Sequence, residues 1–69
     1  MELSARNVLK GTVESVTEGM VDAEVIVKLP GGETIVSVIT KGSAERLGLK
    51  KGQEVHAVIK ASNVIIATD

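Results

Sequence analysis

The chain has 69 residues, with eight Lys and Arg against nine Asp and Glu, one histidine, and no cysteine, Phe, Tyr or Trp. We therefore expect one domain over residues 1–69, with a core that buries too little surface to be very stable alone. Without cysteine there are no disulfides, thiolate metal sites or cysteine nucleophiles, and one histidine cannot form a multi-histidine zinc site. Assembly of identical chains is the remaining way to stabilise so small a domain.

The composition also argues against nucleic acid and membrane partners. Proteins that bind single strands stack bases on aromatic rings, and binding to the phosphate backbone needs an excess of cations, whereas the net charge here is −1. The start, Met1–Ser4, has no basic stretch followed by an apolar one. No apolar run reaches the roughly 20 residues of a membrane helix. We expect a soluble, cytoplasmic protein.

Alternating apolar residues predict the first three strands. These strands cover about 9–14, 21–29 and 33–39, with turns near 17–19 and at Pro30–Gly32. In the second strand the odd-numbered apolar residues share one face, and Asp22, Glu24, Ile26 and Lys28 occupy the other.

A helix interrupts the strand pattern at Lys41–Leu47, and the following Gly48 is a natural helix stop. The fourth strand covers about 54–60, and a short fifth strand covers 64–67. Five strands with one short helix between the third and the fourth are typical of a small Greek-key barrel of the OB type. We therefore predict an all-β, OB-like fold.

Several predicted strands are apolar on both faces, which a small isolated barrel does not need. In the third strand Ile35 and Ile39 lie on one face, and Val36 and Val38 on the other. Such a strand indicates that something covers the outside of the barrel, and this favours a homo-oligomer. The alternative is an ordinary barrel with scattered exposed valines.

Residues for catalysis are missing from the pattern. His56 lies in the middle of a predicted strand, where it is expected to face solvent or an interface, and the acidic residues form no pair for acid–base work. Pro30–Gly32 lacks the Gly-Lys-Ser/Thr ending of a phosphate-binding loop. We predict that the protein is not an enzyme.

Hydroxyl groups and cations instead gather at the ends of the predicted elements. Ser4–Asn7 opens the first strand, Thr40 and Ser43 flank the helix start, and Lys60 ends the fourth strand before the turn Ala61–Asn63. Such donors suit a tetrahedral anion. Each also has an ordinary explanation as a helix cap, a solvated charge or a turn residue. Spacing alone does not rank anion binding above a ligand-free oligomer.

Three segments together resemble the molbindins, the Mop-type molybdate-binding proteins of the molybdenum-pterin-binding family. They are Ser4–Gly11, Val38–Leu49 and Val58–Ser62, which span nearly the whole chain. The resemblance implies an OB-like barrel assembled as a hexamer, a trimer of dimers, with oxyanion sites at the subunit interfaces. It implies binding of molybdate or tungstate for molybdenum storage and homeostasis.

The same resemblance implies which residues bind the oxyanion. One chain contributes Ser4 and Arg6 from its start, and Lys60, the Ala61 backbone and Ser62 from the end of the fourth strand. A neighbouring subunit contributes Thr40 and Ser43. A second kind of site near the threefold axes involves the backbone of Gly19, Met20 and Val21. Two alternatives remain open, a structural oligomer without a ligand and an OB-type module that binds oligonucleotides.

Overall fold

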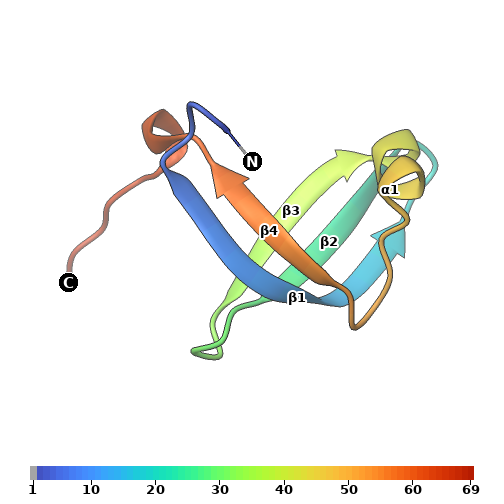
Figure 1. Cartoon of the computed structure of the whole chain (residues 1–69), viewed down its shortest axis with the longest axis horizontal. Coiled ribbons are helices and arrows are strands. Elements are labelled where there is room, and N and C mark those ends of the chain that lie inside the picture. The colour runs from blue at the N-terminus through green and yellow to red at the C-terminus, as the bar shows by residue number, and fades with distance from the viewer. Residues whose placement is uncertain (1) are drawn as a thin grey trace.

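The computed structural model describes residues 2–69. Over these residues the elements are β1 (Asn7–Glu18), β2 (Asp22–Lys28), β3 (Thr34–Thr40), α1 (Lys41–Leu47), β4 (Glu54–Ile59) and the 3-10 helix η1 (Ala61–Asn63). The four strands of the described chain form one antiparallel sheet in the order β3-β2-β1-β4. The sheet curls into a half-barrel with α1 at one end (Figure 1). The predicted all-β architecture with one short helix is confirmed.

Strand β1 is the strand around which the sheet turns. Its first half pairs with β4 and its second half with β2, and Thr12 is in register with both Glu54 and Lys28. The neighbouring Gly11 is buried. Because glycine has no side chain, β1 can pass close to the end of β2 at this position. The register then shifts between Val13 and Ser15, and a bulge of this kind increases the local bend.

The core lies on the concave side of the sheet and is small. Its buried apolar residues are Val13, Ala23, Val25, Val27 and Ala44. In β2 the three odd-numbered positions are buried and their neighbours are not, as the alternating pattern predicts. Half-buried side chains from β3, β4 and the loop after α1 pack against this core.

Helix α1 begins and ends as the sequence predicts. Thr40 Oγ1 accepts a hydrogen bond from the Ser43 amide at 3.1 Å and caps the start. Gly48 ends the helix in the left-handed conformation with φ +62°, which suits a residue without a Cβ atom. The hairpin turn at Pro30–Gly32 also forms, and Gly32 has φ +98°. Within residues 2–69, no helix is long and apolar enough to cross a membrane.

The predicted fifth strand at 64–67 does not form within the single chain. After η1, residues 64–69 form no helix or strand, and Ile65 and Ile66 are 92% and 82% exposed. The segment is apolar enough for a strand, but a strand also needs a neighbour to complete its backbone hydrogen bonds, and in the described residues no other segment pairs with it. The barrel is therefore open between β3 and β4.

The outer face of the sheet carries exposed apolar side chains, as predicted. Val36 and Val38 in β3 are 59% and 65% exposed, and Val58 in β4 is 44% exposed. In β3 the side chains alternate between the two faces, and Ile35 and Ile39 are half-buried against the core. The two-faced strands inferred from the sequence are thus present in the folded chain.

Candidate anion-binding site

One group of predicted donors gathers where the start of the chain meets the end of β4. Asn7 is in register with Ile59, and its side-chain Nδ2 donates to the Ile59 carbonyl oxygen at 3.1 Å. This contact holds the segment before β1 at the same end of the molecule as η1 (Figure 1). The group, called the Lys60 set below, consists of the exposed residues Ser4, Arg6, Lys60, Ala61 and Ser62.

A tight turn follows Lys60 at this end of the molecule. Lys60 precedes η1 in an extended conformation, and the Asn63 amide donates to the Lys60 carbonyl oxygen at 2.8 Å. The ammonium and guanidinium groups of Lys60 and Arg6 give this end local positive charge, although the whole chain carries a net charge of −1. Cations, hydroxyl groups and turn amides are donors suited to an anion.

The second group, called the Thr40 set, consists of Thr40 and Ser43 at the start of α1. Thr40 Oγ1 donates to Ser43 Oγ at 2.8 Å, and Arg46 Nη2 also reaches Ser43 Oγ at 3.4 Å. Because the Ser43 oxygen accepts both contacts, its own hydroxyl hydrogen can be donated to an external acceptor. Thr40 Oγ1 therefore caps the helix, and the hydroxyl hydrogen of Ser43 remains available to an external acceptor.

The Lys60 set and the Thr40 set lie at opposite ends of the sheet (Figure 1). The first set lies beside Asn7 at the beginning of β1. The second follows β3, whose last residue Thr40 is in register with Asp22, just after the far end of β1. Within one chain, the structure does not bring the two predicted halves of the site together.

The residues predicted for a second site, Gly19, Met20 and Val21, form the turn between β1 and β2. The Gly19 amide donates to the Asp22 carbonyl oxygen at 2.7 Å, and the Lys41 amide donates to the Val21 carbonyl oxygen at 2.8 Å. The turn is thereby attached to the start of α1. Met20 is 95% exposed, so this turn projects from the same end as the Thr40 set.

Within residues 2–69, no three acidic or histidine side chains are placed to hold a metal ion. His56 is exposed on β4, in register with Lys10 on the outer face. This agrees with the expectation of a strand residue that faces solvent or an interface.

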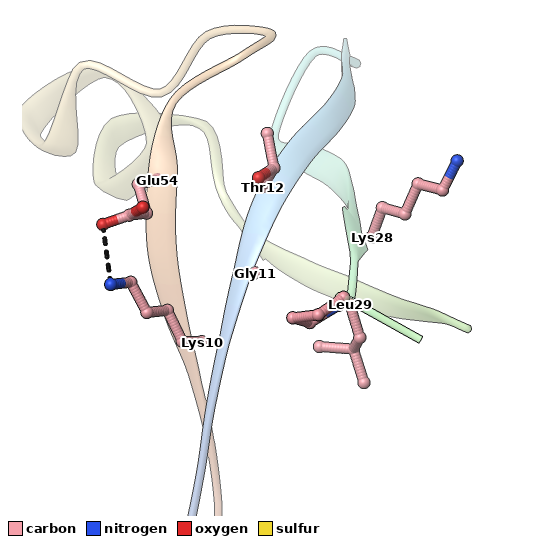
Figure 2. Close-up of a pocket in the computed structure, with 7 residues that line it drawn as sticks. Lys10, Gly11, Thr12, Lys28, Leu29 and Glu54 are labelled. Carbon is pink, nitrogen blue, oxygen red and sulfur yellow. Dashed lines mark ion pairs between the residues drawn. The ribbon is translucent and has the colours of Figure 1, made fainter. Parts of the chain in front are cut away.

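Sequence reasoning missed a hollow on the surface beside the bend in β1. It has a volume of about 480 Å³ and is lined by Lys10, Gly11, Thr12, Lys28, Leu29, Pro30 and Glu54. Lys10 Nζ lies 3.2 Å from Glu54 Oε1, and Lys28 points away from this pair (Figure 2). Both charges of the pair are exposed, so the pair adds little stability. None of the predicted site residues lines this hollow.

Known proteins resemble the chain over nearly its full length. The TOBE domain family matches residues 3–66. Molybdenum-pterin-binding protein 3 of Clostridium pasteurianum is 48% identical over 66 residues, which cover 96% of this chain and 97% of that protein.

Two solved structures share the fold. A molybdate-binding protein from Sporomusa ovata is 32% identical with a TM-score of 0.93, and the match covers 99% of this chain and 100% of that one. The cytoplasmic molybdate-binding protein ModG with molybdate bound is 54% identical with a TM-score of 0.91, and the match covers 94% of this chain and 46% of ModG. The chain therefore belongs to the TOBE domain family, and its homologues include the Mop-type molybdenum-pterin-binding proteins.

Proposed function

We propose that this chain binds molybdate, or the similar tungstate, between copies of itself. Relatives named for molybdenum-pterin binding and the ModG structure with molybdate bound support the choice of ligand. In this proposal residues 1–69 act as one oxyanion-binding domain. The role is storage and homeostasis of molybdenum in the cytoplasm, with binding in place of catalysis.

The observation that carries the proposal is the separation of the donors into two sets at opposite ends of the sheet (Figure 1). The Lys60 set supplies a cation, hydroxyl groups and turn amides, and the Thr40 set supplies hydroxyl groups at a helix start. A buried dianion needs several donors around its oxygen atoms and a compensating charge. Each set is incomplete alone, so a full site joins the Lys60 set of one chain to the Thr40 set of another.

Two further features of the chain support assembly with copies of itself. The buried apolar core is small, and exposed valines on β3 and β4 offer apolar surface to a neighbour. We propose a hexamer built as a trimer of dimers, with the turn Gly19–Val21 contributing backbone donors to a second kind of site. Because molybdate then binds the assembled state, it stabilises the assembly through linkage.

We attribute the proposed preference for molybdate over sulfate to the size of the pocket. Both anions are tetrahedral and doubly charged, but donors held by strands and a helix cap fit the larger anion and leave the smaller one with unmet hydrogen bonds. An unmet buried donor costs about 1–3 kcal/mol, so two of them account for a tenfold or larger preference. Equal affinities for molybdate and sulfate in calorimetry would reject this explanation.

A mixing experiment tests whether the site lies between chains. Lys60→Ala damages the Lys60 set, and the double variant Thr40→Ala, Ser43→Ala damages the other set. When the two variants are refolded together in equal amounts, a site built from two chains finds both sets intact in about one quarter of its copies. Calorimetry should recover that fraction of full-strength sites. No recovery would show that one chain supplies the whole site, and no molybdate binding by the unmodified chain would reject the function.

A further inference from the structure

Arg46 lies in the last turn of α1, but its side chain reaches back toward the start of the helix. Residues three positions apart lie on the same face of a helix, and helical side chains lean toward the N-terminus. Arg46 Nη2 accordingly lies 3.4 Å from Ser43 Oγ. Arg46 thereby places a permanent positive charge beside the hydroxyl group that the proposed function gives to the anion.

The guanidinium group of Arg46 is not neutralised by a carboxylate in the part of the chain that the structure describes. Within residues 2–69, the ion pair that forms is the one between Lys10 and Glu54. Arg46 is exposed, and a cation in the last turn ordinarily stabilises a helix through the helix dipole. That ordinary role requires no contact with Ser43, so the contact points to a second role.

The direction of the Ser43 hydroxyl group depends on what its oxygen accepts. A serine oxygen has two lone pairs and one hydrogen. Thr40 Oγ1 donates to Ser43 Oγ at 2.8 Å and occupies one lone pair, and the Arg46 N–H group occupies the other. A guanidinium group has donors and no acceptor, so the Ser43 hydrogen has no partner on Arg46. With Thr40 and Arg46 both donating, the hydrogen points away from both of them.

We propose that Arg46 is a positioning residue of the anion site, which orients and polarises the Ser43 hydroxyl group so that this group donates to the bound oxyanion. A hydrogen bond from a charged donor is stronger than a neutral one, and hydrogen bonds in a chain polarise one another. Arg46 acts through Ser43 and does not itself touch the anion. This inference rests on the proposed function, because it adds a residue to the Thr40 half of that site.

The Ser43 hydroxyl group loses this orientation when Arg46 is removed. One lone pair of Ser43 Oγ then lacks a donor, and the hydrogen is free to turn toward water or toward Thr40 Oγ1. An arriving anion has to reorient the two hydroxyl groups before it receives the hydrogen bond. The effects of removing Arg46 and of removing the Ser43 hydroxyl group on binding are therefore coupled, as expected for two residues in one hydrogen-bond network.

A double-mutant cycle on the full chain measures this coupling. Its variants are Arg46→Met, which keeps an unbranched side chain without charge or donors, Ser43→Ala, and the two changes together. Calorimetry with molybdate gives the Kd of each. We expect Arg46→Met alone to weaken binding about three- to tenfold, the range of one hydrogen bond. In the Ser43→Ala background the same change should weaken binding less than about twofold, because no hydroxyl group remains to be oriented.

Two further variants separate orientation from general charge. Arg46→Lys keeps a cationic group that only donates, so it should restore most of the affinity that Arg46→Met loses. Lys51→Met removes the same charge from an exposed position outside both donor sets, and it should change the Kd less than about twofold because solvent and salt screen it. A lysine at position 46 that restored no affinity would count against the proposal, and so would an equal loss from Lys51→Met.

The cycle also distinguishes this inference from the proposed function. Arg46→Met that weakens binding equally with and without the Ser43 hydroxyl group would overturn the inference, because Arg46 would then act on the anion directly or only through the stability of α1. An unchanged Kd for Arg46→Met would overturn it as well. In both cases the unmodified chain still binds molybdate and the proposed function stands. No binding by the unmodified chain would reject the proposed function and this inference with it.

Discussion

Gly11 and Val27 lie so close that a Cβ atom added to Gly11 would meet Val27 Cγ1 at 2.6 Å, and the Lys28 carbonyl oxygen at 2.7 Å. Neither neighbour can move freely, because Val27 is buried and Lys28 belongs to the β2 backbone. The bend of β1 therefore depends on a glycine at this position.

Gly11→Ala should consequently destabilise the fold by about 1–3 kcal/mol, the usual cost of extra atoms in a packed region. The matched control is Gly42→Ala in α1, where a Cβ atom meets nothing within 4 Å and where alanine favours the helix by about 0.5–1 kcal/mol. Urea unfolding at one fixed chain concentration measures both. Equal stability of the two variants would show that the close approach at Gly11 is relieved without cost.

The fold was predictable where local pattern decides the structure. Alternation in the second predicted strand places Ala23, Val25 and Val27 on one face, which is the face that the fold buries, and Gly48 marks the end of α1. The fifth strand at 64–67 was not predictable in the same way. Its composition favours a strand, but strand formation depends on a neighbouring edge, which a local pattern does not contain.

Thr40 and Ser43 allow the helix cap to be separated from ligand binding. Thr40→Ala removes the oxygen that accepts from the Ser43 amide, so the ligand-free protein should lose about 0.5–2 kcal/mol of stability. Ser43→Ala keeps that bond and removes only the exposed contacts of Ser43 Oγ with Thr40 and Arg46, so it should reduce the ligand-free stability less than Thr40→Ala does. If Ser43 donates to molybdate, the same variant should weaken binding about two- to tenfold. Thermal unfolding and calorimetry separate the two effects, and unchanged binding by Ser43→Ala would remove Ser43 from the site.

The candidate site shows the same limit of sequence reasoning. The types of donor at Ser4, Arg6, Thr40, Ser43 and Lys60 could be read from the chain, because each lies at the end of an element. Their grouping depends on the register between distant strands, as when Asn7 and Ile59 pair across 52 residues. The hollow beside the β1 bend was missed for a related reason. A glycine inside a strand pattern was its only local signal.

Lys60→Ala should weaken molybdate binding about 10- to 100-fold, because a hydrogen bond to a charged group contributes about 1.5–3 kcal/mol. The fold should remain intact, since Lys60 is exposed and its side chain makes no cap in η1. The control is Lys51→Ala, which removes an exposed lysine from the turn before β4, outside both donor sets. Because both variants change the net charge equally, a similar loss in both would mean that general charge, and not Lys60, attracts the anion.

Molybdate should also raise the melting temperature, and the rise should depend on chain concentration. At 100 times its dissociation constant, a ligand that binds only the folded state stabilises it by about 2.7 kcal/mol per site, and for a domain this small that corresponds to a shift on the order of 10 °C. A site between chains adds a second dependence, because dilution separates the two donor sets before either chain unfolds. The protein should therefore gain less from molybdate when it is dilute. Melting curves over a wide range of chain concentrations measure this difference. A ligand-free structural oligomer would melt at a higher temperature when concentrated but would not respond to molybdate, whereas a site within one chain would respond to molybdate equally at every concentration.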